Sequence, residues 1–501
     1  RDSDSLSGTS GKLNVGSSLD ETVADPILVI SNSTIALDGA LNDCGGRIEL
    51  RDVSVTGAGK LQIGEGNVKH PGVLYATNSV IDSLGSVKYQ AGTIIAEDCA
   101  WTNTSGVFFG SSTVFDWTLR GGSYSQKSGQ SSLGGGTRAV SALHLERGAV
   151  LRGADRSEAY DDFPDEVCSI HPEGSKKVLL YAYDAEDIAV TGEGAIDGQG
   201  PRFFDTEHPN PWGTYKKPPV QRPRMVQFVR VKGVRLSGVT FKDSPCWTML
   251  VRSCENVDVD GITVTGDQKM INNDGIDFDC CRHVRVRRSR FKTGDDCLIL
   301  RAMREKPGDH VVCEDVIVTD CTLDSACQTI RLGCPSDDTI RHARFSNIRG
   351  RGYNGVKLEC PVRYLRPDDE GYLDISDIVI DGYTGTFEGA PVQVFVEGGV
   401  KVRNVSDITF RNFDVTGKLP VLLRGNADSP LRNVRLADCK VTVRAKGVEP
   451  LDLQATEPLV LERCILNGKP VADEKRVTPR GERVPLVRVE KTSWETQKQT
   501  K

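Results

Sequence analysis

A short pattern of apolar and polar positions recurs along the second half of the chain. It reads apolar-x-apolar-x-x-apolar-x-apolar and first occurs at residues 234–241. Further copies follow at intervals of 23 to 38 residues. They start at Val257, Val284, Val316, Ile340, Ile378, Ile408, Val434 and Leu459. Because the alternation has a period of two, each copy predicts two short strands separated by a bend.

This repeat predicts a stacked architecture. Glycine stands at several of the bends, as at Gly238, Gly261 and Gly382. No helical periodicity separates the copies, so a fold with a helix in each crossover is disfavoured. We expect an all-β fold, a right-handed parallel β-helix with additional N-terminal β structure, in which each coil buries its apolar side chains against the next. The longer intervals indicate inserted loops near residues 301–312 and 361–375.

Three regions are expected along the chain. Residues 1–135 form an N-terminal β region, with a polar lead and strand-like pieces that show no clean repeat. A Ser/Gly-rich stretch at 124–137 marks a junction or an exposed loop. Residues 136–466 form the β-helix domain. The charged tail, residues 467–501, is expected either to cover the open end of the helix or to remain mobile.

Composition and charge exclude several classes of protein. The 501 residues include 63 Lys+Arg and 69 Asp+Glu, a formal net charge of -6. This balance argues against a dedicated nucleic-acid binder, whose surface is basic, and no stretch approaches the roughly 18 apolar residues of a membrane span. The 15 cysteines are an odd number. Cys321, Cys439 and Cys464 occupy the same apolar slot of the repeat, so we predict that they point inward as small hydrophobes rather than form disulfides.

Carboxylates gather in two short segments, residues 272–279 and 293–297. Asp274 and Asp295 are about one coil apart, so they are expected on adjacent coils, roughly 5 Å apart along the axis. Both stand beside glycine, at bends where a side chain can leave the wall of the helix. Asp296, which follows Asp295 at its bend, can then reach the same outer cleft.

Three carboxylates in one small area have a chemical consequence. Their repulsion raises the pKa of at least one of them and can supply a general acid beside ionised partners. Hydrolysis of a glycoside with inversion uses such a set, with one protonated carboxyl for the leaving oxygen and carboxylates for the water. Two alternative roles for these residues stay open at this point. Asp and Asn beside glycine also make simple turns, and clustered aspartates can bind calcium.

From about residue 140 to 440 the chain resembles polygalacturonases, glycoside hydrolase family 28 of the pectin-lyase-like β-helix superfamily. The matching stretches are residues 179–188, 192–200, 222–228, 243–247, 272–275 and 294–296. The last two carry the family's Asn-x-Asp-Gly and Gly-Asp-Asp motifs. The resemblance implies an inverting hydrolase without a metal or another cofactor. It also implies that Asp295 is the general acid and that Asp274 and Asp296 hold and activate the water.

Two motifs depart from the family pattern. Gln328 stands where the family has the histidine of Gly-His-Gly. The family then has Arg-x-Lys, which in polygalacturonases binds the substrate carboxylate; here Lys357 replaces the Arg and Glu359 replaces the Lys. A glutamate would repel the carboxylate of a uronic acid, and Glu359 could instead accept hydrogen bonds from neutral sugar hydroxyls.

The remaining candidates are substrate-binding residues. We expect Asn272, Gln328, Lys357 and Glu359 to contact the substrate, and Trp212, in the exposed-looking stretch 210–215, to stack on a sugar. The arginines that could supply a relocated anion site are Arg301, Arg331 and Arg363. The seven histidines are scattered, and no spacing among them suggests a metal site.

We therefore expect an inverting glycoside hydrolase that acts on a pectin-related or other acidic polysaccharide. Its partner is a poly- or oligosaccharide, with no nucleic acid and no membrane, and its location is secreted or periplasmic, although no signal peptide is visible. Two alternatives stay open, a calcium-dependent polysaccharide lyase and a non-catalytic carbohydrate-binding β-helix. The sugar, the linkage, endo or exo action and the oligomeric state do not follow from the sequence.

Overall fold

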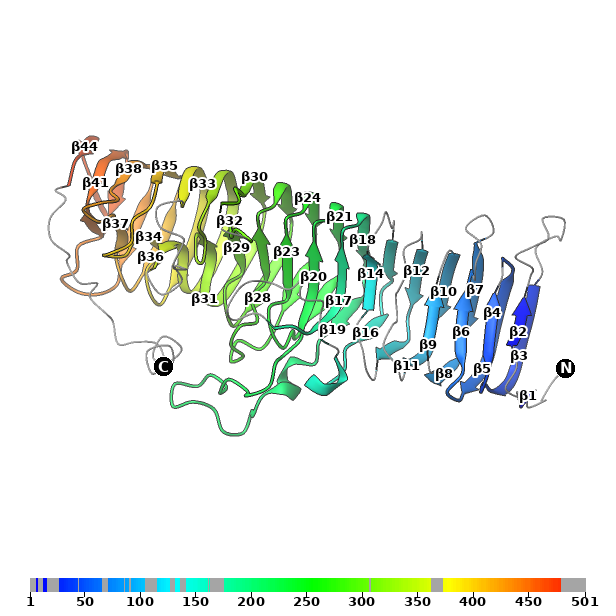
Figure 1. The fold of residues 1–501 in the computed structure, drawn as a ribbon. Helices are drawn as coiled ribbons and strands as arrows, with labels where there is room; N and C mark the ends of the chain where they lie inside the picture. The colour runs from blue at the N-terminus through cyan, green and yellow to red at the C-terminus, as the bar shows by residue number, and fades with distance from the viewer. Residues whose placement is uncertain are drawn as a thin grey trace. The chain divides into compact units, whose positions relative to one another are not determined.

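The computed structural model is built almost entirely from short strands (Figure 1). Two short 3-10 turns, η1 (Ser157–Ala159) and η3 (Gly200–Phe203), are the helical elements of the described residues. The structure describes residues 6–7, 12–15, 27–43, 45–64, 71–84, 86–89, 92–103, 115–126, 131–135, 141–160, 162, 175–305, 308–361 and 373–478. Most of the predicted lead, part of the Ser/Gly-rich stretch, Arg363 and most of the predicted tail therefore lie outside the described residues.

By its internal contacts the chain divides into two compact units. The first comprises Arg1–Phe203, Pro219–Met249 and Cys254–Thr263, and the second comprises Phe204–Pro218, Leu250–Ser253 and Val264–Lys501. β23 (Met249–Arg252) and β25 (Thr263–Thr265) have residues in both. The predicted region boundaries after residues 135 and 466 stay predictions. Within the described ranges, no helix is long and apolar enough to cross a membrane.

The first unit stacks parallel strands in register. Its strands are β1 (Leu6–Ser7), β2 (Lys12–Val15), β3 (Ile27–Ala36), β4 (Ala40–Asp43), β5 (Arg47–Thr56), β6 (Lys60–Ile63), β7 (Gly72–Thr77), β8 (Val80–Leu84), β9 (Ser86–Tyr89), β10 (Gly92–Glu97), β11 (Ala100–Asn103), β12 (Phe115–Arg120), β13 (Ser123–Gln126), β14 (Ser131–Gly135), β15 (Ser141–Leu145), β16 (Val150–Arg152), β17 (Val178–Tyr183), β18 (Glu186–Gly192), β19 (Ala195–Asp197), β20 (Arg224–Val229), β21 (Lys232–Ser237), β22 (Thr240–Lys242) and β24 (Glu255–Asp260). One inward column runs through Leu74, Ile94, Trp117, Leu143, Val190, Leu236 and Val259. Every member of the column is buried, so the predicted N-terminal β structure is confirmed, and it consists of regular coils.

The second unit repeats this arrangement. Its strands are β26 (Ile276–Asp279), β27 (Arg282–Arg287), β28 (Arg290–Thr293), β29 (Leu298–Arg301), β30 (Val312–Thr319), β31 (Thr322–Leu332), β32 (Thr339–Cys360), β33 (Asp374–Phe387), β34 (Val392–Val396), β35 (Asn404–Arg411), β36 (Asp414–Gly417), β37 (Val421–Arg424), β38 (Leu431–Ala437), β39 (Lys440–Val443), β40 (Leu451–Gln454), β41 (Thr456–Glu462), β42 (Ile465–Leu466), β43 (Lys469–Pro470) and β44 (Glu474–Arg476). Its inward column runs through Val286, Val318, Phe345, Ile380, Phe410, Leu436 and Leu461. The predicted apolar slots therefore stack on one another.

The bends of the repeat have a left-handed backbone. Gly238, Gly261 and Gly382 have φ of 76°, 64° and 74°, and Asp320 and Asp438 stand at equivalent bends with φ of 57° and 56°. Glycine adopts this conformation without strain, and Asp tolerates it better than most residues. The predicted bend between the two strands of each copy is confirmed.

The thirteen cysteines of the described ranges are all free and buried. Cys321, Cys439 and Cys464 are each at most 2% exposed. Their thiols lie close to backbone carbonyls; Cys464 Sγ, for example, lies 3.4 Å from the carbonyl oxygen of Leu436 on the preceding coil. The prediction that these three fill the core as small hydrophobes is confirmed.

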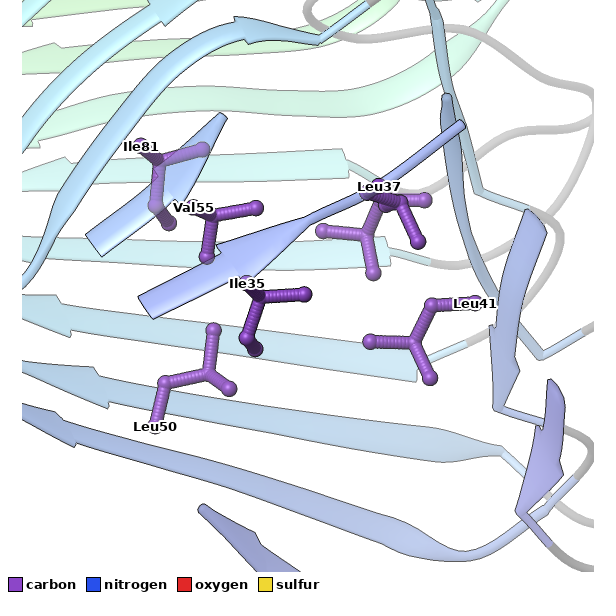
Figure 2. A pocket seen from close by; sticks show the side chains of 7 residues that line it. Ile35, Leu37, Leu41, Leu50, Val55 and Ile81 are labelled. Atoms are coloured by element: carbon purple, nitrogen blue, oxygen red, sulfur yellow. The ribbon is translucent and has the colours of Figure 1, made fainter. Parts of the chain in front are cut away.

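Each unit has a distinctive terminal coil. In the first, an apolar pocket opens among side chains of β3, β4, β5, β6 and β8 (Figure 2), and it is lined by Ile35, Leu37, Leu41, Leu50, Val55, Leu61 and Ile81. In the second, β44 pairs antiparallel with β41, and β43 pairs antiparallel with β42. The described start of the predicted tail thus folds back on the last coil.

Candidate active site

One outer face of the second unit carries a group of charged side chains that are almost fully buried. Along β26, Ile276 and Phe278 point into the core, so Asp277 and Asp279 point to the opposite face. The parallel register continues this face across β29, β31 and β32. We call it the charged face, and its members are Arg252, Asp277, Asp279, Arg301, Arg331, Lys357 and Glu359. All seven are at most 6% exposed.

The two predicted acidic motifs pack against each other at the edge of this face. Gly275 donates its backbone N–H to the carbonyl oxygen of Asp296 over 2.8 Å. A Cβ atom on Gly275 would lie 2.1 Å from the carbonyl oxygen of Cys297, and one on Gly294 would lie 2.1 Å from that of Met270. Both glycines are therefore required by close backbone approach, which places the acidic segments on adjacent coils.

Asn273 ties the two motifs together, and the sequence analysis did not single it out. Its Oδ1 accepts a hydrogen bond from the Gly294 N–H over 2.7 Å, and its Nδ2 donates to the carbonyl oxygen of Asp267 over 3.1 Å. The side chain is 2% exposed. Its position between the predicted Asn272 and Asp274 was the available signal.

Asp295 is the most accessible of the three predicted catalytic aspartates. It is half-buried, whereas Asp274 and Asp296 are 3% and 1% exposed. Its Oδ2 accepts a hydrogen bond from the Asn272 N–H over 3.2 Å and lies 3.5 Å from Asn272 Nδ2. Its carbonyl oxygen accepts hydrogen bonds from the hydroxyls of Thr293 and Ser325. The carboxyl group thus faces outward from a fixed backbone.

Asp296 is compensated by positive charge. Its Oδ2 accepts a hydrogen bond from Arg331 Nη1 over 2.8 Å, and its Oδ1 accepts one from the backbone N–H of Gln328 over 3.1 Å. Gln328 is fully buried, and its Oε1 accepts from the Cys327 thiol. The backbone of Gln328, rather than its side chain, therefore contacts the carboxylate.

Asp274 is the group with the strongest electrostatic perturbation. Burial raises its pKa well above the usual range, and the nearby carboxylates of Asp295, Asp277 and Asp296 raise it further, while Arg301 opposes the shift. Its Oδ1 is buried and has no hydrogen-bond partner among the described residues. The group of three carboxylates therefore retains a proton at a pH where an isolated aspartate has lost it.

Glu359 lies between two cations. Its Oε2 is 3.0 Å from Arg331 Nη2 and 3.1 Å from Lys357 Nζ. Because Arg331 also contacts Asp296, the chain of contacts runs Asp296, Arg331, Glu359, Lys357. The predicted substrate-binding residues Arg331, Lys357 and Glu359 are thus in direct contact with one another and, through Asp296, with the predicted catalytic group.

Two further ion pairs extend the charged face beyond the predicted residues. Arg301 Nη2 lies 2.8 Å from Asp277 Oδ1, and Arg252 Nη1 lies 2.9 Å from Asp279 Oδ2. Asp277, Asp279 and Arg252 were missed by the sequence analysis. The alternation of apolar and acidic residues in Ile276-Asp-Phe-Asp279 was the signal for the two aspartates.

Trp212 lies apart from this network, on the loop of residues 204–218. It is 46% exposed, and its Nε1 donates to Thr214 Oγ1 over 3.0 Å. Tyr215 anchors the same loop beside the first acidic motif, because its hydroxyl donates to Asp267 Oδ2 over 2.7 Å. The loop therefore holds an exposed aromatic ring on an anchored backbone.

One group among the described residues has the spacing of a metal site. Carboxylate oxygens of Asp295 and Asp296 and the sulfur of Cys327 lie within 4.8 Å of one another. Calcium prefers six to eight oxygen ligands, and a thiol is not among them. Asp296 is also engaged by Arg331. This set of residues does not fit calcium.

The fold and this cluster define a class, a parallel β-helix with a group of carboxylates on one outer face. Residues 169–313 match the sequence profile of Glycosyl hydrolases family 28. A probable polygalacturonase of Vitis vinifera is 28% identical over 25% of this chain and 24% of its own length. A probable endopolygalacturonase A of Neosartorya fischeri is 24% identical over 48% of this chain and 70% of its own length.

A solved structure agrees with these matches. A hyperthermoactive exopolygalacturonase from Thermotoga maritima superposes with a TM-score of 0.55 at 19% identity, covering 73% of this chain and 87% of that one. At this identity the likeness shows the fold, and the predicted right-handed parallel β-helix is confirmed. The expected resemblance to polygalacturonase-like glycoside hydrolases of family 28 is confirmed by the sequence matches.

Proposed function

We propose that this protein is an inverting glycoside hydrolase that cleaves a pectin-related polysaccharide with three aspartates. The observation that carries the proposal is the grouping of Asp274, Asp295 and Asp296 on adjacent coils, where burial and the neighbouring carboxylates raise the pKa of Asp274. Such a cluster holds a proton for the leaving group beside carboxylates that can activate water. The names of the relatives support a pectic substrate.

Asp295 takes the role of general acid. It is the accessible member of the three, so it can reach the glycosidic oxygen of a bound chain. We take Asp274 and Asp295 to share one proton, because the Asp295 carboxylate contributes to the raised pKa of Asp274. With the substrate bound, the proton resides on Asp295 and is transferred to the leaving oxygen as the bond from that oxygen to the anomeric carbon breaks.

Asp274 and Asp296 hold the attacking water. Arg331 contacts Asp296 and compensates its charge, and Asp296 orients the water. Asp274, ionised once the shared proton is on Asp295, accepts the proton that the water loses as its oxygen bonds to the anomeric carbon. The proton then returns to Asp295 within the coupled pair, which restores the starting state.

Other residues of the same unit are proposed to support substrate binding. Asn272 holds the Asp295 carboxylate, and the exposed ring of Trp212 offers a stacking surface for a sugar. Gln328 positions Asp296 through its backbone. We further propose that the protein acts outside the cytoplasm, secreted or periplasmic, because its polymeric substrate is found there.

The test is Asp295→Asn, compared with the wild type on a panel of pectic polysaccharides. We expect the variant to lose at least about a thousandfold in kcat, with an unchanged unfolding temperature, because general acid catalysis and the charge pattern are both removed. NMR of the first product should show the inverted anomer. Near-normal turnover by the variant would refute the acid role, and a retained anomer would refute inversion.

The same assay separates the other two functions. A lyase would release an unsaturated product that absorbs near 235 nm and would lose activity in chelator, whereas a hydrolase releases reducing ends without that absorbance. Absence of both products on the whole panel would favour a non-catalytic carbohydrate-binding protein.

A further inference from the structure

The cations of the charged face are all engaged by carboxylates of the same face. Arg331 contacts Asp296 and Glu359 at 2.8 and 3.0 Å, and Lys357 contacts Glu359 at 3.1 Å. Arg301 and Arg252 contact their own aspartates. These contacts are buried, so they are only weakly screened by solvent. The positive charges nearest the catalytic group are thus already compensated.

The charges of the site can be counted directly. The carboxylates are Asp274, Asp277, Asp279, Asp295, Asp296 and Glu359, and the cations are Arg252, Arg301, Arg331 and Lys357. Even with one proton shared between Asp274 and Asp295, the group is negative. A uronic acid above Arg331 and Lys357 would meet no positive surplus among these residues, and it would approach several carboxylates.

An anionic sugar could bind there only by displacing Glu359 from its cations. Glu359 is 6% exposed, and a buried carboxylate without its partners is strongly destabilising. A neutral sugar avoids this exchange, because its hydroxyls can donate to Glu359 while both ion pairs persist. Gln393, half-buried and in register with Lys357, adds a neutral polar group to the same face.

From these contacts we infer that the sugar lying over Arg331, Lys357 and Glu359 is neutral. The inference rests on the proposed hydrolase function and defines its substrate class: a pectic chain in which the residue at this subsite is a neutral sugar or a methyl-esterified uronate. A free uronate at this position is rejected.

The wild-type enzyme tests the inference without a mutation. Homogalacturonan can be prepared as the free acid and as the full methyl ester, which have the same backbone and differ in charge. We expect kcat/KM to be at least about tenfold higher on the ester, and added salt to raise the rate on the free acid more than on the ester. A preference for the free acid would overturn the inference and leave the hydrolase function standing.

Glu359→Gln sharpens the test. Removing the Glu359 carboxylate brings the counted charges of the site from net negative to neutral and takes a carboxylate away from Arg331 and Lys357. The ester-to-acid ratio of kcat/KM should therefore fall at least about tenfold. Glu462→Gln is the matched control, since Glu462 is a half-buried glutamate that pairs with Arg435, and its ratio should stay that of the wild type. An unchanged ratio in a folded Glu359→Gln variant would contradict the inference.

Binding separates this inference from the proposed reaction. Calorimetry with Asp295→Asn and a short oligomer in each form measures the preference without turnover, and we expect tighter binding of the ester. If the wild type cleaves nothing, the hydrolase proposal fails while this measurement still decides the subsite. Tighter binding of the free acid would refute the neutral subsite whether or not the wild type is active.

Discussion

The second unit pairs aspartate with arginine in two very different settings. On the charged face, Arg331 and Asp296 are almost fully buried, and Asp274 beside them has a raised pKa. Elsewhere on the same unit, Arg411 Nε lies 3.1 Å from Asp381 Oδ2 with both side chains partly exposed, and the hydrogen bond from Arg411 lowers the pKa of Asp381. The residue types and the one-coil spacing are alike.

The difference lies in burial and in the ratio of charges. Asp381 has a cation of its own and contact with water, so its ionised form is favoured. Asp274 is buried among more carboxylates than cations, so its ionised form is disfavoured. Aspartates and arginines thus form an exposed ion pair in one place, and in the other they surround a buried carboxyl group with a raised pKa. Burial, together with the charge balance of the neighbourhood, decides which.

The largest expected effect separates the two settings directly. Arg331→Met should cost about 3–5 kcal/mol of folding free energy, because it leaves Asp296 buried without its cation and Glu359 with Lys357 alone. It should also abolish turnover. Denaturant unfolding monitored by circular dichroism measures the first effect. A loss below about 1 kcal/mol would show that the buried contact is no stronger than a surface pair.

Removing the aspartates should change the unfolding temperature by a smaller amount, and in opposite directions in the two settings. The raised pKa of Asp274 means that the folded protein binds its proton more tightly than the unfolded chain, so this group's stabilising contribution is lost as pH rises through the raised pKa. Asp274→Asn should therefore unfold at a higher temperature than the wild type at pH 7, with a flatter fall at high pH, although it is inactive.

Asp381→Asn is the control for that experiment. Its pKa is lowered, so its contribution is present above its ordinary pKa and is lost as pH falls through the lowered value. The variant should differ from the wild type above about pH 4 and converge with it in acid. If the unfolding temperatures of the two variants changed with pH in the same way, the proposed distinction between the buried Asp274 and the exposed Asp381–Arg411 pair would be wrong.

How much of the fold and of the site could be predicted depends on whether the sequence pattern behind each feature lies within one short segment. The apolar slots at Val234, Val316 and Val434 are local, so strands, bends and the parallel stack followed from the sequence. The N-terminal coils use the same stacking, but their slots hold residues such as Ala76 and Trp117. Because the side chains in these slots differ in size, the repeat was not recognised in the N-terminal sequence, although β structure was expected there.

The site divides in the same way. Asp274, Asp295 and Asp296 stand beside glycine in recognisable motifs, and the structure places them on adjacent coils. The engagement of Glu359 by Arg331 and Lys357 depends on the register of β31 with β32. No local pattern specifies that register, so Glu359 was expected to repel an anionic substrate directly. The contacts add a second way for Glu359 to act, through the cations that it neutralises, which is the proposal made above.

The smallest expected effect completes the comparison. Arg411→Met removes the cation of the exposed pair and should cost less than about 1 kcal/mol, because Asp381 remains solvated and is free to hydrate. The chemical change equals that of Arg331→Met, so the ratio of the two losses, measured by the same denaturant titration, isolates burial as the cause. Equal losses would mean that the charged face is stabilised like any exposed ion pair, and the raised pKa of Asp274 would then need another origin.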